Sequence, residues 1–324
     1  MLTANEILQK INSYLDNMPY ERKPQSLYEP VKYVLSMGGK RIRPSLMLMA
    51  YNLYKDDPES ILSQACGLEI YHNYTLLHDD LMDNAAMRRG HQTVHLKWNA
   101  NTAVLSGDSM YVLAFRRMAQ CAPDKMKPML DIFIETALQV GEGQQYDMDF
   151  EKRNDVTEEE YIEMIRLKTS VLLACALKIG AVLAGASESD ADNLYKFGEQ
   201  IGLAFQLQDD YLDVYGDPKV FGKAIGGDIL CNKKTYMLIN AYNRADEARR
   251  KELVKWITAT DFKPEEKIKA VTEIYNELGI DRLAKDKIKY YFDQSRKYLD
   301  LVSVDDERKS VLRAYADAMM GRKA

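Results

Sequence analysis

The chain has 324 residues and a formal net charge of −5; 46% of its residues are hydrophobic and 29% are charged. This balance is typical of a globular protein with a large core, and the acidic excess argues against a general nucleic-acid binder. The four cysteines lie far apart and form no CxxC pair, so we expect free thiols rather than disulfides or zinc ligands.

The N-terminal residues carry no basic start and no long apolar run, which predicts no signal peptide and a cytoplasmic location. The most apolar segment is 171–186, and it has Lys178 in its middle. It is short for a bilayer, so the sequence favours a core helix over a membrane span.

Apolar residues recur at helical spacing along nearly the whole chain, as Ile7, Ile11 and Leu15 do near its start. A cap residue before a first-turn proline, or a capping box, indicates helix starts at Asp57-Pro58, Thr157 to Glu160 and Lys263-Pro264. Breaks are expected at Gly38-Gly39, Arg89-Gly90, Gly216-Asp217-Pro218 and Gly226-Gly227. There is no linker and no convincing strand pair, so the sequence predicts one all-α domain of ten or more helices over residues 1–324.

An aspartate cluster ends an apolar helical run early in the chain. Asp79 and Asp83 are four residues apart and project from one helix face, with Asp80 to one side. Close carboxylates repel one another, and a divalent cation such as Mg²⁺, which prefers oxygen ligands, offsets that repulsion. Taken alone, the cluster is equally well explained as a solvated acidic patch.

The same spacing returns 130 residues later, in Asp209, Asp210 and Asp213. The turns before each triplet are apolar and must be buried, which is difficult to reconcile with a solvated face. Two such triplets facing one cavity would form a clamp for metal ions and a diphosphate. We call these six residues the aspartate clamp.

Basic residues accompany both triplets. Lys40, Arg41 and Arg43 lie in a glycine-rich turn that opens an apolar helix, where backbone N–H groups and cations suit phosphate binding. The other candidates are His72, two turns before Asp79, and Arg88, Arg89, Lys168, Lys223, Lys233 and Lys234. The alternatives are a basic surface loop, a structural histidine and, for Lys168, a side chain that reaches solvent.

A charge count supports this assembly. The six aspartates contribute −6, a bound diphosphate about −3, and about three Mg²⁺ ions would add about +6. The remainder requires several nearby lysines or arginines. A second diphosphate would need cations of its own.

With these motifs in order, the chain resembles the trans-isoprenyl diphosphate synthases of the polyprenyl synthetase family. The resemblance extends over nearly the whole chain. It is carried by Gly38 to Pro44, His72, His78 to Asp83, Arg88-Arg89-Gly90, Gly143 to Asp147, Lys168-Thr169-Ser170, Phe205 to Asp213, Gly222-Lys223 and Gly227-Asp228 through Lys233-Lys234-Thr235. It implies the isoprenoid synthase fold, with mostly antiparallel helices around a central cavity, and a homodimer.

The resemblance also implies roles for the matching residues. Isopentenyl diphosphate would be bound by Lys40, Arg43, His72 and Arg89. The allylic diphosphate would be bound by Arg88, Lys168, Thr169, Gln206, Lys223 and Lys233. Direct metal ligands would be Asp79, Asp83 and Asp209, with Asp80, Asp210 and Asp213 orienting waters or cations, and Lys168 and Lys223 would join the catalytic group.

The implied reaction is head-to-tail condensation of an allylic diphosphate (dimethylallyl, geranyl or farnesyl) with isopentenyl diphosphate. Mg²⁺ and the cations would stabilise the departing diphosphate and leave an allylic carbocation, which the double bond of isopentenyl diphosphate attacks. The released diphosphate would accept the proton, and apolar walls would exclude water.

Product length is expected to depend on the helix that carries Asp79. Tyr74, Thr75 and Tyr71 precede Asp79 by five, four and eight residues, and in the family a bulky residue at such positions acts as a floor. The first motif lacks the two extra residues of many bacterial farnesyl-forming members. The sequence therefore predicts C15 to C20 products without deciding between them, and Tyr71 and Tyr74 serving only the core is the alternative.

Three other functions are weighed against the synthase. A type I terpene cyclase shares the fold, but it usually carries an Asn/Ser/Glu motif where this chain has a second aspartate triplet. A non-catalytic partner subunit tends to lose aspartates, and this chain keeps all six. A helical scaffold with acidic patches leaves the accompanying basic residues unexplained.

Overall fold

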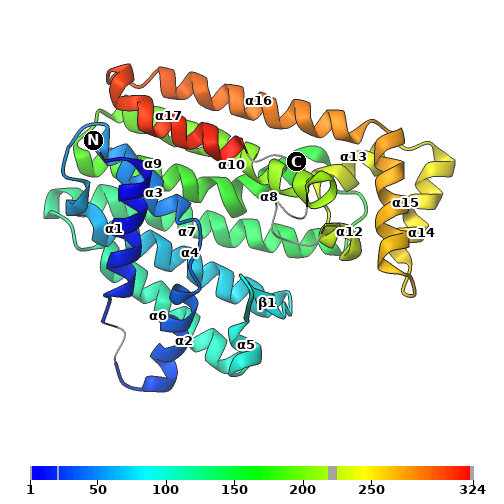
Figure 1. The fold of residues 1–324 in the computed structure, drawn as a ribbon, viewed down its shortest axis with the longest axis horizontal. Helices are drawn as coiled ribbons and strands as arrows, with labels where there is room; N and C mark the ends of the chain where they lie inside the picture. Colours follow the sequence, from blue (N-terminus) through cyan, green and yellow to red (C-terminus); the bar gives the residue numbers. More distant parts are fainter. Residues whose placement is uncertain (1, 20–21, 218–224, 322–324) are drawn as a thin grey trace. The chain divides into compact units, whose positions relative to one another are not determined.

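The computed structural model describes residues 2–19, 22–217 and 225–321. Apart from turns and loops, these residues are almost entirely helical (Figure 1). The first helices are α1 (Ala4–Asp16), α2 (Gln25–Ser36), α3 (Ile42–Asn52), η1 (Pro58–Ile61), α4 (Leu62–Met82), α5 (Val94–Lys97), α6 (Ala100–Met118) and α7 (Pro123–Glu151). They are followed by α8 (Glu158–Ile165), η2 (Arg166–Ser170), α9 (Val171–Ala184), α10 (Glu188–Tyr215), α12 (Gly227–Leu230), α13 (Tyr236–Arg244), α14 (Glu247–Thr258), α15 (Pro264–Glu277), α16 (Ile280–Asp300) and α17 (Asp306–Met320). The all-α prediction is confirmed.

The helix boundaries follow the local signals in the sequence. Pro58 is the first residue of η1 and Pro264 the first of α15, where the missing N–H of proline costs no hydrogen bond. Thr157 and Glu160 form the expected capping box at the start of α8. These three predicted starts are therefore confirmed.

One short ribbon was not foreseen. Strand β1 (Met87–Arg88) pairs antiparallel with β2 (His91–Gln92) around the Arg89-Gly90 turn. The prediction that no strand pair occurs is wrong at this point, because two residues per strand are too few to show alternation in the sequence. The ribbon matters because it carries Arg88 and the turn residue Arg89.

Contacts group the chain into two compact units. The first unit is Met1–Ile134, Cys175–Leu194 and Ser303–Leu312, and the second is Glu135–Ala174, Tyr195–Val302 and Arg313–Ala324. The single domain over residues 1–324 stays a prediction.

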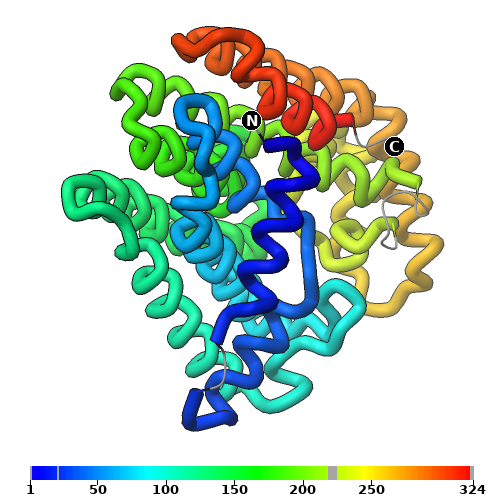
Figure 2. Tube along the Cα trace, turned by 60° about the vertical axis from the view of Figure 1, so that its left-hand side comes forward, coloured from blue at the N-terminus to red at the C-terminus, as the bar shows by residue number. Residues whose placement is uncertain are grey.

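In the first unit, α4 packs most extensively against α6 and also contacts α1 and α3. Figure 2 traces these segments as a tube, with α1 in dark blue. Cys66, Leu68 and Ile70 of α4 are fully buried. The aspartate motif at the end of α4 is thus held by a helix that is enclosed along much of its length.

In the second unit, one apolar cluster joins α8, the C-terminal half of α10, α13, α15 and the start of α16. Its buried members include Tyr161, Leu207, Tyr236 and Ile274. In Figure 1, α14 and α15 stand side by side, in agreement with their contacts. This core fixes the part of α10 that carries Asp209 to Asp213.

Among the described residues, one helical stretch, Glu158–Ala184, is long and apolar enough to cross a membrane by length and composition alone. Of its most apolar window, 72% is buried inside the protein, as in a core helix. Lys178, the charge within it, pairs with Asp192 at 2.7 Å. All four cysteines are free thiols, as expected.

Candidate active site

The first aspartate triplet lies at the C-terminal end of α4, with Asp83 as its C-cap. Asp80 is buried, and its Oδ1 accepts hydrogen bonds from Arg88 Nε at 2.9 Å and Nη2 at 2.5 Å. Asp79 is partly exposed and its carboxylate lies 3.6 Å from Arg88 Nη2, while Asp83 is exposed. Burial raises the pKa of Asp80, and Arg88 opposes that shift. Asp80 therefore anchors Arg88, while Asp79 and Asp83 remain accessible.

The second triplet repeats this division near the end of α10. Asp210 is buried and accepts hydrogen bonds from the Tyr161 hydroxyl and from Gln206 Nε2. Burial raises its pKa to about 7, and the negative charge of Asp228 adds to the shift. Asp213 accepts the backbone N–H of Asp228 at 2.9 Å, whereas Asp209 is partly exposed. The middle aspartate of each triplet is thus tied to protein groups.

Both triplets lie where a helix least favours negative charge. The C-terminal end of a helix carries a partial negative charge from its unpaired carbonyl groups, so carboxylates there are destabilising. Asp79, Asp83 and Asp209 stand within the last two turns of α4 and α10 or at the cap. A bound cation or a nearby basic side chain offsets this unfavourable interaction between the carboxylates and the helix end.

Among the described residues, no three His, Cys, Asp or Glu side chains come together as a set that would hold a metal ion unaided. The aspartates of the clamp are divided between the units, with Asp79, Asp80 and Asp83 in the first and Asp209, Asp210 and Asp213 in the second. Metal binding is therefore carried below as a proposal.

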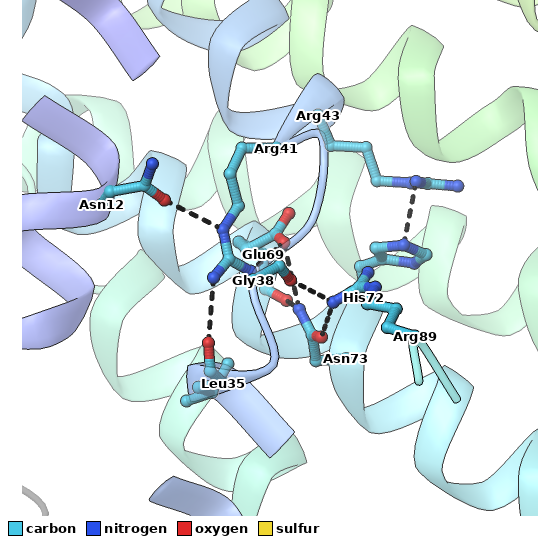
Figure 3. A network of polar contacts seen from close by, with 9 residues as sticks. All are labelled: Asn12, Leu35, Gly38, Arg41, Arg43, Glu69, His72, Asn73 and Arg89. Carbon is cyan, nitrogen blue, oxygen red and sulfur yellow. Dashed lines mark hydrogen bonds and ion pairs between the residues drawn. The ribbon is translucent and has the colours of Figure 1, made fainter. Parts of the chain in front are cut away.

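A partly buried group of basic residues lies in the first unit beside α4. Arg43 Nη1 lies 3.1 Å from His72 Nε2 (Figure 3). A guanidinium can only donate, so His72 Nε2 accepts this bond and its proton resides on Nδ1. Burial first, and then the neighbouring arginines, hold the pKa of His72 well below its usual range, which keeps the ring neutral. Lys40 is exposed in the turn before α3.

Burial also lowers the pKa of Arg43, to about 10, and the pKa of Arg89 below its ordinary value. Neither guanidinium forms an ion pair with a carboxylate of the described residues, although Glu69 attracts both. Partly desolvated cations that have no ion-pair partner destabilise a folded chain, even where neutral groups accept their hydrogen bonds. An anion bound beside them would remove that cost.

The second unit places the predicted Lys168-Thr169 pair on a π-helical turn, η2, between α8 and α9. Such turns are rare and frequently occur at functional sites. Lys168 Nζ lies 2.5 Å from Asp147, and Thr169 Oγ1 donates to Gln206 Oε1 at 3.1 Å. Gly143 of α7 makes this possible, because any Cβ there would overlap the backbone of Lys168.

Lys233 follows α12, and its backbone N–H bonds to Asp228 O at 2.9 Å. The positive charge of Lys233 acts to lower the pKa of Asp210, so the two side chains interact electrostatically within the second unit. Lys223 and its neighbours Phe221 and Gly222 lie outside the described residues. Their predicted role stays a prediction.

Aromatic side chains surround the predicted product-length residues. Tyr74 stacks near Tyr111 of α6 and near Tyr71, with ring centroids 5.2 and 5.6 Å apart. Phe115 and Phe133 extend the cluster, at 4.9 Å from each other. Thr75 is partly buried, with its hydroxyl bonded to His72 O at 2.8 Å. Tyr74 is thus backed by an aromatic layer.

The comparisons agree with this chemistry. Residues 24–275 match the family model described as Polyprenyl synthetase. The chain is 43% identical to the "Short chain isoprenyl diphosphate synthase" of Methanocaldococcus jannaschii over 85% of this chain and 83% of the relative. It is 35% identical to the "Geranylgeranyl diphosphate synthase" of Methanosarcina mazei over 97% and 95%.

The chain belongs to the polyprenyl synthetase family. A crystal structure of a geranylgeranyl pyrophosphate synthase superposes on it with a TM-score of 0.94, at 40% identity and over 100% of both chains. The predicted identity, a short-chain prenyltransferase of the trans-isoprenyl diphosphate synthase type, is thereby confirmed. Family membership favours the synthase over the cyclase and the scaffold.

Sequence reasoning missed the roles of several residues of this synthase's site. Arg41 was expected to be a phosphate-binding cation, and that prediction is wrong because its buried guanidinium is bonded to Glu69 and to the carbonyl of Leu35. Arg41, Glu69 and Asn73 hold the cationic group together, Asp147 pairs with Lys168, and Tyr111 backs Tyr74. Glu69 had one available signal, since a carboxylate in the middle of an apolar helix requires a partner. Asn73, Tyr111 and Asp147 are ordinary helical residues whose roles arise from packing between segments that are distant in sequence.

Proposed function

We propose that this synthase condenses an allylic diphosphate with isopentenyl diphosphate, head to tail, and that its principal product is the C20 diphosphate. The observation that carries the substrate proposal is a pair of partly desolvated guanidiniums, Arg43 and the more exposed Arg89, that lack an ion pair among the described residues. With Lys40 and the neutral His72 they suit the diphosphate of isopentenyl diphosphate. The C20 choice is supported by the names of two relatives reported above and by the aromatic layer behind Tyr74.

We propose further that the reaction depends on Mg²⁺, about three ions per site. Asp79, Asp83 and Asp209 would bind the ions directly, since each is at least partly exposed. Asp80, Asp210 and Asp213, which already bond to protein groups, would orient waters or cations. When bound, the metal supplies electrostatic stabilisation of the departing diphosphate. The donor set fits, since all six ligand candidates offer carboxylate oxygens.

The chain's own residues would perform the remaining steps. Lys168, Thr169, Gln206 and Lys233, with Lys223 and Arg88, would hold the allylic diphosphate and neutralise the charge that develops on it. The double bond of isopentenyl diphosphate would then attack the allylic carbon, and the released diphosphate would take up the proton. Apolar side chains along α4 would exclude water from the cationic intermediate.

This mechanism requires that the aspartate clamp act as one site. We therefore propose that residues 1–324 work as a single domain in which both triplets line a central cavity. We also propose a cytoplasmic enzyme. The burial of the apolar stretch Glu158–Ala184 supports a core helix rather than a membrane span.

The overall proposal is tested by incubating the protein with isopentenyl diphosphate, Mg²⁺ and each allylic primer in turn. We expect release of one diphosphate per condensation and accumulation of the C20 product. Chelation by EDTA should abolish the reaction, and added Mg²⁺ should restore it. No diphosphate release with any primer would refute the synthase, and full activity after chelation would refute the metal dependence.

Replacing Tyr74 by alanine should lengthen the product by at least one C5 unit, because it opens space beside α4 for a longer chain. Tyr111→Ala alone should have a smaller effect, since Tyr74 would still separate it from the chain. Tyr14→Ala on α1 serves as the control. Chromatography of the dephosphorylated products measures the distribution, and an unchanged pattern in Tyr74→Ala shows that the floor lies elsewhere.

We propose a homodimer that buries the outer face of α6. Leu105 and Val112 are two turns apart on that face and are 59% and 65% exposed, and Val104 is 41% exposed. Exposed apolar side chains of this size on one helix face indicate an interaction surface. Val112→Asp should halve the mass measured by light scattering, whereas Val254→Asp on α14 should not. An unchanged dimer in Val112→Asp would place the interface elsewhere.

A further inference from the structure

Arg41, in the turn between α2 and α3, bonds to three other segments through its side chain. Its guanidinium donates from Nη1 to Glu69 Oε1 at 2.7 Å, from Nη2 to Leu35 O at 2.9 Å and from Nε to Asn12 Oδ1 at 3.3 Å (Figure 3). The side chain is buried, with 3% exposed. One residue thus joins α1, the end of α2 and the middle of α4.

The backbone of Arg41 is held in an unusual conformation. Its φ of 49° and ψ of 37° lie in the left-handed region, which non-glycine residues rarely adopt. Such a conformation persists only when surrounding contacts determine it. The three hydrogen bonds of the side chain supply those contacts, so they also set the path of the preceding residues Gly38, Gly39 and Lys40.

Glu69 extends the network along α4. Its Oε1 also accepts a hydrogen bond from Asn73 Nδ2 at 3.1 Å, one helical turn further on. Asn73 in turn accepts a hydrogen bond through Oδ1 from Arg89 Nη1 at 3.4 Å. A chain of contacts therefore runs from Arg41 through Glu69 and Asn73 to Arg89 (Figure 3).

Arg89 closes the chain of contacts into a ring. Its Nη1 also donates to the carbonyl of Gly38, in the turn that Arg41 shapes. Gly39 has a φ of 137°, and a Cβ at this position would lie 2.8 Å from the guanidinium carbon of Arg89. The guanidinium of Arg89 thus lies directly against the backbone of the turn.

Glu69 is also the carboxylate that balances this group electrostatically. It is the leading attractive charge on both Arg43 and Arg89, while the arginines repel one another. Its own side chain is 2% exposed. Its negative charge would repel a diphosphate, so it is unsuited to bind one directly, but it counters the mutual repulsion of the arginines.

We propose that Arg41, Glu69 and Asn73 form a positioning set that fixes the turn at Gly38 to Lys40 and the side chain of Arg89 for the diphosphate of isopentenyl diphosphate. The proposal rests on the function proposed above, in which Lys40, Arg43, His72 and Arg89 bind that substrate. None of the three residues is required to touch the substrate. Their effect is to hold the binding groups in one geometry before the substrate arrives.

Asn73→Ala and Arg41→Met test the set by steady-state kinetics with both substrates varied. We expect the KM for isopentenyl diphosphate to rise about tenfold or more in each, because small misplacements of binding groups are costly. The KM for the allylic diphosphate should stay within about twofold and kcat within about threefold of the parent enzyme. Asn52→Ala is the matched control, since Asn52 is another buried asparagine of the first unit, bonded to the carbonyl of Lys55.

The double variant Arg41→Met/Glu69→Leu separates positioning from stability. Arg41→Met alone leaves a buried carboxylate without its partner and should lower Tm, whereas replacing both partners by apolar residues should restore much of it. If the pair positions the site, the raised KM for isopentenyl diphosphate persists in the double variant. A KM that returns to the parent value together with Tm would overturn the proposal, as would equal rises in both KM values.

Calorimetry with inorganic diphosphate alone keeps this test independent of turnover. If the parent enzyme released no diphosphate in the assay above, the proposed function would fail, but the anion affinity of Asn73→Ala could still be compared with that of the parent. A weaker affinity in Asn73→Ala than in Asn52→Ala supports the positioning set. Equal affinities in the parent and Asn73→Ala would refute it.

Discussion

Asp79→Ala should lower kcat/KM about 1000-fold without destabilising the metal-free protein. The loss in rate corresponds to about 4 kcal/mol of transition-state stabilisation, the range expected when a metal ligand is removed. The stability expectation follows from position, because Asp79 adds a negative charge to the C-terminal end of α4 next to two other carboxylates. Removing it relieves repulsion, so Tm in EDTA should be unchanged or higher.

Asp80→Ala provides the contrast. Asp80 is the main partner of Arg88, and its loss leaves that half-buried guanidinium with only the 3.6 Å contact to Asp79. This variant should therefore lose both activity and thermal stability. Asp131→Ala, which removes an exposed carboxylate paired with Lys127, serves as the control. A near-normal rate in Asp79→Ala would refute the aspartate clamp, and an equal loss of Tm in Asp79→Ala and Asp80→Ala would refute the division of roles.

Lys168→Met should lower kcat about 100- to 1000-fold while leaving the KM for isopentenyl diphosphate within about twofold. The ammonium group is expected to neutralise charge that develops on the leaving diphosphate, and one such preorganised donor is typically worth this factor. Its position on the π-helical turn η2, paired with Asp147, indicates a group held in place rather than a solvated surface lysine. Single-turnover kinetics with excess enzyme measures the chemical step directly.

Lys178→Met is the matched control for this experiment. Lys178 follows Lys168 by ten residues, is also partly exposed, and also pairs with an aspartate, Asp192, at 2.7 Å. Removing it deletes the same kind of ion pair, which is worth up to about 1 kcal/mol at a surface. Equal rates for the two variants would show that Lys168 has only a structural role.

The carboxylate motifs illustrate how far the sequence could predict the site. The DDxxD spacing and the apolar turns before it indicated six candidate ligands, and these residues do lie at the ends of α4 and α10. The spacing could not show that Asp80 and Asp210 are buried against Arg88 and Tyr161. That division depends on partners contributed by other segments, which a local pattern does not contain.

The basic residues show the same limit in another form. Arg43, His72 and Arg89 were recognisable from their motifs, but the sequence also predicted phosphate binding for Arg41, which lies in the same motif as Arg43. Its side chain turns into the protein because its left-handed backbone conformation directs it toward Glu69. Sequence reasoning treats neighbouring arginines alike. In the structure, Arg41 is buried against the carboxylate of Glu69, whereas Arg43 has no ion pair among the described residues.

The sequence by itself determined the helical class, the helix starts at Pro58, Glu158 and Pro264, and the spacing of the two aspartate triplets at the ends of apolar helices. These follow from interactions within a few residues, such as caps, apolar periodicity and charge spacing. Only the tertiary structure decided which charges are paired, which are buried, and how Arg41, Glu69 and Asn73 link the turn before α3 to Arg89. Burial and charge pairing depend on desolvation and on contacts between segments that can lie tens of residues apart. These contacts form only when the helices pack together.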